Sequence, residues 1–139
     1  MKNILIINGA NLNLLGKRET DIYGTRSFED YLQGLRNDFL SQCNIDYFQS
    51  NIEGEIVDKI QSATADAIVI NAGGYTHTSV VIRDAIACKS SSIPCIEVHI
   101  SNIYAREEFR HTSLLSPVCN GSVIGFGLKG YKLAIASVL

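Results

Sequence analysis

Three short apolar segments of the chain each run into a polar segment that begins with an amide or imidazole side chain. The first runs into Asn8, the second into Asn71 and the third into His99. Short β-branched runs of this kind are typical of strands buried on both faces of a parallel sheet. Because ligands of open α/β sheets bind outside the carboxyl ends of the strands, these polar side chains are expected to converge on one pocket.

The third apolar segment also carries Glu97, two residues before His99. Residues two apart on a strand point to the same face. A carboxylate beside an imidazole fixes the tautomer of the ring and raises its basicity, which suits a general acid. The pair alone is equally compatible with a structural acid that satisfies a core histidine.

The segment after Asn71 contains Gly73, Gly74 and His77. The glycines allow a tight turn and a close approach of a ligand to the backbone. We expect a helix to follow and to offer its positive end to an anion such as a carboxylate. His77 is placed to hydrogen-bond a hydroxyl at the pocket mouth, whereas a simple turn remains the alternative for the two glycines.

The long polar segment over residues 8–26 contains Arg18 and Tyr23, with Gly16 and Gly24 on either side. Such long loops inside compact domains are usually functional, and the glycines suggest a hinged lid over the pocket. A nearby guanidinium favours the phenolate, and lowering a tyrosine pKa from about 10 to about 8 takes roughly 3 kcal/mol. Tyr23 is therefore a candidate base, although a loop arginine and tyrosine are more often plain surface residues.

A second polar segment, residues 101–120, supplies Arg110. A guanidinium makes bidentate hydrogen bonds to carboxylates or vicinal hydroxyls. Arg106 lies four residues earlier and competes for the same role, and a solvated surface charge is the alternative for both. His111 is expected at the surface.

The elements that must position these residues alternate between strand and helix. Strands are expected over residues 3–7, 45–49, 67–70, 94–100 and 122–126, and helices over about 27–40, 53–62, 76 or 78 to 88, and 128–138. Ser27 and Asp30 form a capping-box-like start for the first helix, and Val80 and Val81 belong to the expected apolar stripe of the third. The pattern predicts one α/β domain over residues 1–139, a flavodoxin-like doubly wound five-stranded parallel sheet in the order 2-1-3-4-5 with helices on both faces.

Composition narrows the class of protein. The net charge of −2 gives no electrostatic footprint for nucleic acid, and a mean hydropathy of +0.12 without a long apolar run argues against a membrane span. A strand that starts at once predicts no signal peptide. The four cysteines form no C-x-x-C pair and are expected to be free, buried thiols of a cytoplasmic protein. Neither a Walker lysine motif, a G-x-S-x-G elbow, an H-E-x-x-H motif nor a convincing metal site is present in the sequence.

Taken in order, these segments resemble the type II 3-dehydroquinate dehydratases of the shikimate pathway. The resemblance covers nearly the whole chain and rests on residues 8–16 (NGANLNLLG), 18–19 with 23–24 (RE and YG), 71–79 (NAGGYTHTS), 97–102 (EVHISN) and 106–110 (REEFR). It implies a flavodoxin-like enzyme that dehydrates 3-dehydroquinate to 3-dehydroshikimate. The implied reaction is an anti elimination through an enolate, with no metal, cofactor or Schiff base.

The resemblance also implies catalytic roles for five residues. Tyr23 matches the proton acceptor, and Arg18 matches the group that lowers its pKa. Asn11 matches the side chain that holds a water against the enolate oxygen. His99 matches the acid that protonates the departing hydroxyl, with Glu97 behind it.

Substrate contacts and assembly follow from the same resemblance. Asn71 and the backbone N–H groups of Ile100 and Ser101 match a carboxylate clamp, His77 and Arg110 match ring-hydroxyl contacts, Gly73 and Gly74 form the adjoining turn, and Asp84 matches a substrate-site position close to a subunit boundary. The family is typically a homododecamer, a tetramer of trimers. This chain has Ala10 and Thr20 where the family usually has proline, which should make the free loop more flexible.

Other interpretations remain open at this point. One is a non-catalytic flavodoxin-like module that binds a nucleotide or sugar acid at the turn formed by Gly73 and Gly74. Another is a dehydratase that forms a Schiff base through Lys129 or Lys132. A third is a purely structural, oligomer-forming protein. Whether the enzyme would serve biosynthesis of aromatic compounds or quinate breakdown is not encoded in these motifs.

Overall fold

The computed structural model describes residues 1–17, 21 and 25–139. Parallel strands form one sheet in the predicted order β2-β1-β3-β4-β5. The strands are β1 (Lys2–Asn8), β2 (Cys43–Gln49), β3 (Ala67–Asn71), β4 (Cys95–His99) and β5 (Gly121–Ile124). The flavodoxin-like topology expected from the sequence is confirmed.

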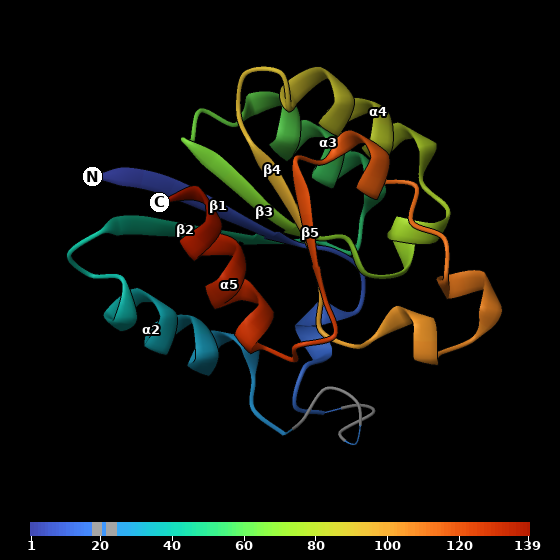
Figure 1. Cartoon of the computed structure of the whole chain (residues 1–139), viewed down its shortest axis with the longest axis horizontal. Coiled ribbons are helices and arrows are strands. Elements are labelled where there is room, and N and C mark those ends of the chain that lie inside the picture. The colour runs from blue at the N-terminus through green and yellow to red at the C-terminus, as the bar shows by residue number, and fades with distance from the viewer. Residues whose placement is uncertain (18–20, 22–24) are drawn as a thin grey trace.

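Helices cover both faces of the sheet (Figure 1). One face packs against α2 (Phe28–Asp38) and α5 (Lys129–Val138), and the other against α3 (Glu53–Ser62) and α4 (Val80–Lys89). The central strands β1 and β3 lie between these two layers, which is why their sequences are continuous apolar runs rather than alternating ones. All five residues of β3 are buried.

Local side-chain contacts explain where the helices begin and which face they bury. The predicted cap of α2 is present, because the Ser27 hydroxyl accepts the backbone N–H of Asp30 at 3.2 Å. Leu40 was expected in the stripe of this helix but lies beyond its end and is 72% exposed. Val80 and Val81 were wrongly placed in the core, because they lie off the face that α4 buries. That face is formed by Ile82, Ala85 and Ile86.

Several element boundaries differ from the prediction, among them the start of α4 and the end of β5. Helix α4 begins at Val80 rather than near Thr76 or Thr78, because the Ser79 hydroxyl caps it by accepting the N–H of Ile82 at 3.0 Å. The short 3-10 helix η2 (Gly73–His77) fills the interval before it. Strand β5 ends at Ile124, two residues earlier than expected.

The segment between β4 and β5 contains three 3-10 helices, where the sequence suggested a single helical turn. They are η3 (Ile103–Ala105), η4 (Glu108–Arg110) and η5 (Ser116–Val118). This segment extends away from the carboxyl end of β4 and returns to β5 (Figure 1). It therefore lies at the edge of the sheet where a ligand is expected.

The four cysteines are free thiols. Cys43 and Cys95 are buried as predicted and Cys119 is half-buried, but Cys88 is exposed on α4. Within the part of the chain that the structure describes, every helix is too short or too polar to cross a bilayer.

Candidate active site

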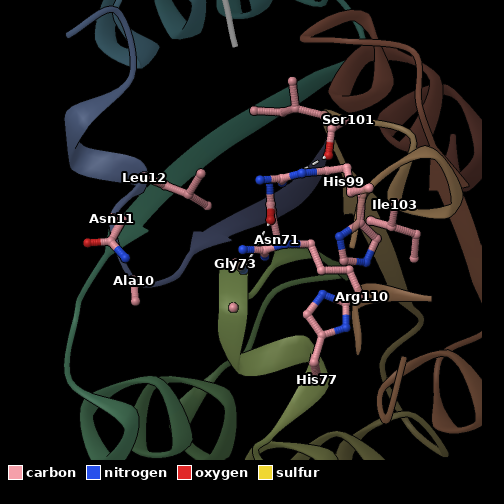
Figure 2. A pocket seen from close by; sticks show the side chains of 13 residues that line it. Ala10, Asn11, Leu12, Asn71, Gly73, His77, His99, Ser101, Ile103 and Arg110 are labelled. Carbon is pink, nitrogen blue, oxygen red and sulfur yellow. Dashed lines mark hydrogen bonds between the residues drawn. The ribbon is translucent and has the colours of Figure 1, made fainter. Parts of the chain in front are cut away.

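A pocket opens at the carboxyl ends of β1, β3 and β4, as the sequence predicted, and encloses about 610 Å³ including space open to solvent. Asn71 reaches it from β3, His99 from β4, His77 from η2 and Arg110 from η4 (Figure 2). The described residues that line it are Ala10, Asn11, Leu12, Asn71, Gly73, Gly74, His77, His99, Ile100, Ser101, Ile103, Arg106 and Arg110. The expected convergence of separate polar segments on one site is therefore present in the fold.

The loops after β1 and β3 meet backbone to backbone at one wall of the pocket. Gly73 adopts a φ of 64°, and a Cβ on it would lie 2.7 Å from the carbonyl oxygen of Ala10. Asn11 adopts the left-handed φ of 70°, and its N–H donates to Asn51 Oδ1 at 2.9 Å. Gly73 is thus required by the contact between two loops, whereas a Cβ on Gly74 would meet open space.

The amide of Asn71 is held in one orientation. Its Oδ1 accepts the backbone N–H of Gly73 at 3.2 Å, and its Nδ2 donates to the hydroxyl of Tyr131 at 2.9 Å. The Tyr131 hydroxyl in turn donates to Asn8 Oδ1 at 2.7 Å, and complete burial raises the pKa of this phenol, so it stays protonated. Asn8 therefore supports the pocket through Tyr131 instead of lining it. Sequence reasoning missed Tyr131, since a lone tyrosine in an apolar helix is typical of core packing.

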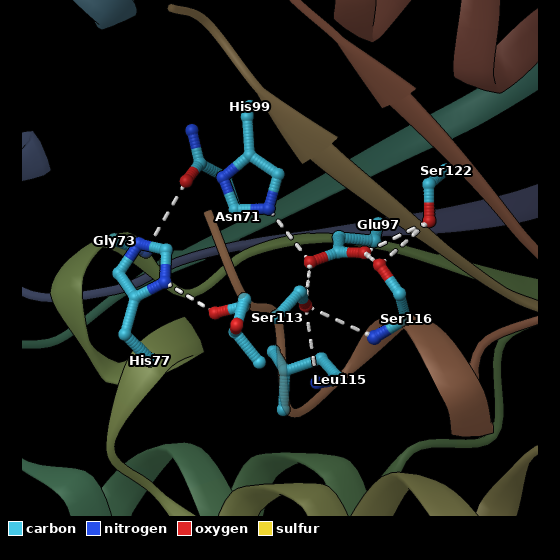
Figure 3. Close-up of polar contacts among 10 residues, drawn as sticks. Asn71, Gly73, His77, Glu97, His99, Ser113, Leu115, Ser116 and Ser122 are labelled. Carbon is cyan, nitrogen blue, oxygen red and sulfur yellow. Dashed lines mark hydrogen bonds and ion pairs between the residues drawn. The ribbon is translucent and has the colours of Figure 1, made fainter. Parts of the chain in front are cut away.

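The predicted pair of Glu97 and His99 is joined at the base of the pocket. His99 Nε2 lies 2.6 Å from Glu97 Oε2, and the carboxylate is fully buried. Three serine hydroxyls, from Ser113, Ser116 and Ser122, also donate to this carboxylate (Figure 3). Burial alone would raise the pKa of Glu97, but the hydrogen bonds from His99, Ser113 and Ser116 and the charge on His99 outweigh it and lower the pKa to about 2.

A charged Glu97 determines how the ring of His99 is used. The carboxylate can only accept, so Nε2 carries the hydrogen that is shared with it. Nδ1 is then the ring nitrogen that remains for a ligand in the pocket. An imidazolium with this orientation can deliver a proton from Nδ1 while Glu97 stabilises its charge.

The ring of His77 lies beside that of His99, with 6.4 Å between the ring centroids. Its Nδ1 donates to the carbonyl oxygen of Thr112 at 2.8 Å, which leaves the lone pair on Nε2. Burial, more than any other effect, lowers the pKa of His77, so the ring is neutral near pH 7. A neutral imidazole with this tautomer accepts a hydrogen bond from a hydroxyl, in agreement with the expected role.

Both arginines of the segment after β4 reach the pocket. Arg110 Nε pairs with Glu107 Oε1 at 3.1 Å, and Arg106 Nη1 donates to Ser101 Oγ at 3.3 Å. The sequence left the choice between the two open, and the structure places both beside Ile100 and Ser101. Two guanidinium groups on one wall favour an anionic ligand.

Some predicted site residues are not brought together here. Arg18 and Tyr23, like Thr20, lie outside the described residues. Asp84 is on α4, 63% exposed in its side chain and 3.0 Å from Arg83, and it does not line the pocket that the described residues form. The expected helix end at the pocket was wrong, because η2 intervenes and α4 begins farther along the chain at Val80.

The serines around Glu97 were missed by sequence reasoning. Ser122 pairs with Glu97 in the register of β4 and β5, so the strand order combined with the sequence offers a signal for it. Ser113 lies in irregular chain and Ser116 begins the short 3-10 helix η5, and neither position carries a comparable signal in the sequence. The candidate Schiff-base lysines do not reach the described pocket, and Lys132 pairs with Asp38 on α2 at 3.2 Å.

Comparisons with known proteins agree with this geometry. The family described as Dehydroquinase class II matches residues 2–139. The chain is 55% identical to the 3-dehydroquinate dehydratase of Campylobacter jejuni subsp. jejuni strain 81-176, over 98% of this chain and 86% of the relative. It is also 55% identical to the 3-dehydroquinate dehydratase of Caldicellulosiruptor bescii, over 97% of this chain and 94% of that relative.

Comparison with solved structures also finds type II dehydroquinases. The type II dehydroquinase from Butyrivibrio crossotus superposes with a TM-score of 0.95 at 51% identity, covering 99% of this chain and 97% of that one. The type II dehydroquinase from Propionibacterium acnes gives a TM-score of 0.93 at 40% identity, covering 99% and 96%. The family match and the superpositions cover nearly the whole chain, and the chain belongs to the class II dehydroquinase family.

Proposed function

We propose that this chain is a 3-dehydroquinate dehydratase, a hydro-lyase that converts 3-dehydroquinate to 3-dehydroshikimate. Family membership and the named relatives support this activity. The observation that carries it is the charged Glu97 bonded to His99 Nε2 within a pocket that also presents Asn71, His77 and Arg110. This arrangement supplies a proton donor together with groups that bind a carboxylate and hydroxyls.

The substrate is a cyclohexanone that carries a carboxylate and several hydroxyls. The amide of Asn71 and the backbone N–H groups of Ile100 and Ser101 clamp the carboxylate, beside the guanidinium of Arg106. Neutral His77 accepts a hydrogen bond from a ring hydroxyl. Arg110 donates to hydroxyls on the same side of the pocket.

The reaction is an elimination of water in two steps. Tyr23, ionised beside Arg18, removes a proton from the carbon next to the ketone, and the electron pair forms an enolate that Asn11 stabilises through a water. The enolate then collapses, the carbon–oxygen bond of the leaving hydroxyl breaks, and His99 gives that oxygen its proton. The products are one water molecule and an enone.

The two catalytic groups must work on opposite faces of the ring for the elimination to be anti. His99 approaches from the sheet, at the end of β4. Tyr23 belongs to the segment after β1 and is expected to close from the other side. Separate positions for the base and the acid are what paired acid and base chemistry requires.

Residues 1–139 form one catalytic domain in this proposal, which assembles in the cytoplasm as a homododecamer, a tetramer of trimers. Val80 and Val81 are more than half exposed on the helix that carries Asp84. Such apolar residues on a charged helix are suited to burial against another subunit. Asp84 then reaches the substrate of a neighbouring subunit rather than its own.

An ultraviolet turnover assay tests the activity, because the enone product absorbs where the substrate does not. Purified protein is expected to convert 3-dehydroquinate, and Tyr23→Phe to abolish turnover while substrate still binds. Binding without turnover by the wild-type chain would favour the non-catalytic module. Inactivation by borohydride in the presence of substrate would instead point to a lysine Schiff base.

A further inference from the structure

The hydroxyl of Ser113 has only one direction in which its hydrogen can point. Its oxygen accepts the backbone N–H of Leu115 at 3.1 Å and that of Ser116 at 3.0 Å. Backbone N–H groups can only donate, so the hydroxyl hydrogen must go to its third partner. That partner is Glu97 Oε2, 2.5 Å away.

The carboxylate of Glu97 is surrounded by donors on both oxygens. Oε2 accepts from Ser113 and from His99 Nε2, and Oε1 accepts from Ser116 and Ser122. A carboxylate has about four acceptor positions, so these contacts fill them. No position is left among them for a proton from His99, and the imidazole must keep its hydrogen on Nε2 throughout the reaction.

The residue before Ser113 acts on the other imidazole of the pocket. The carbonyl oxygen of Thr112 accepts from His77 Nδ1 at 2.8 Å. The dipeptide of Thr112 and Ser113 therefore bridges His77 and Glu97, contacting His77 through its backbone and Glu97 through its side chain (Figure 3). One short stretch of chain sets the hydrogen positions of both rings.

Resting on the proposed dehydratase activity, we infer that Ser113 is a positioning residue for the elimination. Its hydroxyl holds Glu97 as a fixed anion, and Glu97 in turn fixes the ring of His99 with Nδ1 available to the leaving hydroxyl. The serine also withdraws charge from the carboxylate, which keeps the imidazolium a strong enough acid to release its proton. Without it, Glu97 would bind the imidazolium more tightly.

The pH dependence of Glu97 and His99 is also influenced by the other charged and titratable groups around them. Among the described residues these are His77 beside the ring, Arg106 and Arg110 on the pocket wall, and the neutral thiol of Cys119 near Glu97. None of them is altered by a change at Ser113 to a residue of similar size. A change in the pH profile of a Ser113 variant can therefore be assigned to the carboxylate of Glu97.

The test compares Ser113→Ala and Ser113→Thr with Ser137→Ala as a matched control. Ser137 lies on α5, and its hydroxyl donates to the carbonyl oxygen of Ala134 in the same helix, so that variant should match wild type. Ser113→Ala is expected to lower kcat about 10-fold or more, the usual effect of removing a residue that supports a catalytic group without touching the substrate. Its KM should stay within about twofold of the wild-type value. The basic limb of its kcat–pH profile should move to higher pH, because a less solvated carboxylate stabilises the imidazolium, and Ser113→Thr should restore both values.

Ser122→Ala provides a second route to the same carboxylate, because Ser122 donates to Glu97 from β5 and caps no backbone N–H in this segment. It should move kcat and the basic limb in the same direction by a smaller amount. A purely structural role for Ser113 would lower the melting temperature and leave the pH limb in place, and that result would overturn the inference. So would folded variants with wild-type kcat and pH profile.

The failure of this inference is separable from failure of the proposed function. Absence of wild-type turnover would refute the dehydratase activity itself. Wild-type turnover with unchanged behaviour in Ser113→Ala and Ser122→Ala would refute only the role of the serine.

Discussion

At the scale of single residues, the buried carboxylate of Glu97 is the group that orients His99, the proposed acid catalyst. Burying a charge is costly unless it is paired and hydrogen-bonded, and here one imidazole and three hydroxyls provide that compensation. The same contacts that hold the charge also orient His99. Stability and catalysis are therefore linked through one side chain.

Acid unfolding should report this link. The pKa of Glu97 is about 2 in the folded chain against an ordinary 4.5, so its contribution to stability is complete above pH 4.5 and is lost as pH falls toward 2. The contribution is about 3 kcal/mol. Denaturant unfolding at fixed protein concentration should show a drop from pH 7 to pH 2 that is smaller by about this amount in Glu97→Gln. Parallel pH curves for the two proteins would show that the carboxylate is not stabilised as described.

At the scale of elements, the pocket is built where loops and helices meet the ends of strands. The contact between the loops after β1 and β3 depends on Gly73, and the amide at the end of β3 depends on Tyr131 from α5. Each of these two contacts can be tested by a substitution with a matched control variant.

Gly73→Ala should destabilise the chain by about 1–3 kcal/mol, because its φ of 64° is strained for alanine and the new Cβ would press on the carbonyl of Ala10. Gly74→Ala adds a methyl group where nothing lies within 4 Å, so its stability should stay within about 0.5 kcal/mol of wild type. Denaturant unfolding of the two variants gives the comparison. Equal effects would mean that the loop contact is not what requires Gly73.

Tyr131→Phe removes the hydroxyl that joins Asn8 to Asn71 inside the core. Losing one partner of a buried hydrogen bond should cost about 1–3 kcal/mol of stability. KM should rise several-fold with a smaller change in kcat, because the proposed partner of Asn71 is the substrate carboxylate and not the reacting atoms. Tyr47→Phe is the control, since its hydroxyl accepts a long 3.4 Å hydrogen bond from Asn8 Nδ2 and does not contact Asn71 among the described residues. Equal KM values in the two variants would contradict a role for Tyr131 in holding Asn71.

The sequence predicted those strands and site residues that a regular apolar pattern marks, and it missed residues outside such patterns. Continuous apolar runs define β1, β3 and β4, so the ends of β3 and β4 were predicted to within one residue of Asn71 and His99. The start of α4 was misplaced because Thr76, Thr78 and Ser79 are all plausible caps, and only tertiary packing selects Ser79. Hydroxyl donors such as Ser113 arrive from irregular chain, where no periodicity exists to place them.

At the scale of the whole molecule, the single chain presents most but not all of the expected site. Asp84 is exposed on α4, on the same element as the exposed Val80 and Val81. An assembly that buries these valines would bring Asp84 against a second subunit. The proposed dodecamer therefore completes the site as well as covering apolar surface.

Light scattering should give a mass near that of twelve copies of the 15.2 kDa chain. Asp84→Asn should lower kcat/KM at least 10-fold, although Asp84 does not line the pocket that the described residues form. Asp58→Asn, an exposed change on α3, should leave activity unchanged. A fully active monomer, or wild-type kinetics in Asp84→Asn, would contradict a shared site.

The proposed elimination depends on a base and an acid that act from opposite faces of the bound ring. Turnover of 3-dehydroquinate that carries deuterium stereospecifically at the carbon next to the ketone tests this most directly, with the product analysed by mass spectrometry. We predict loss of the deuterium that lies anti to the departing hydroxyl and retention of the one that lies syn. Loss of the syn deuterium, with the anti label retained in the enone, would contradict the proposed geometry of Tyr23 and His99.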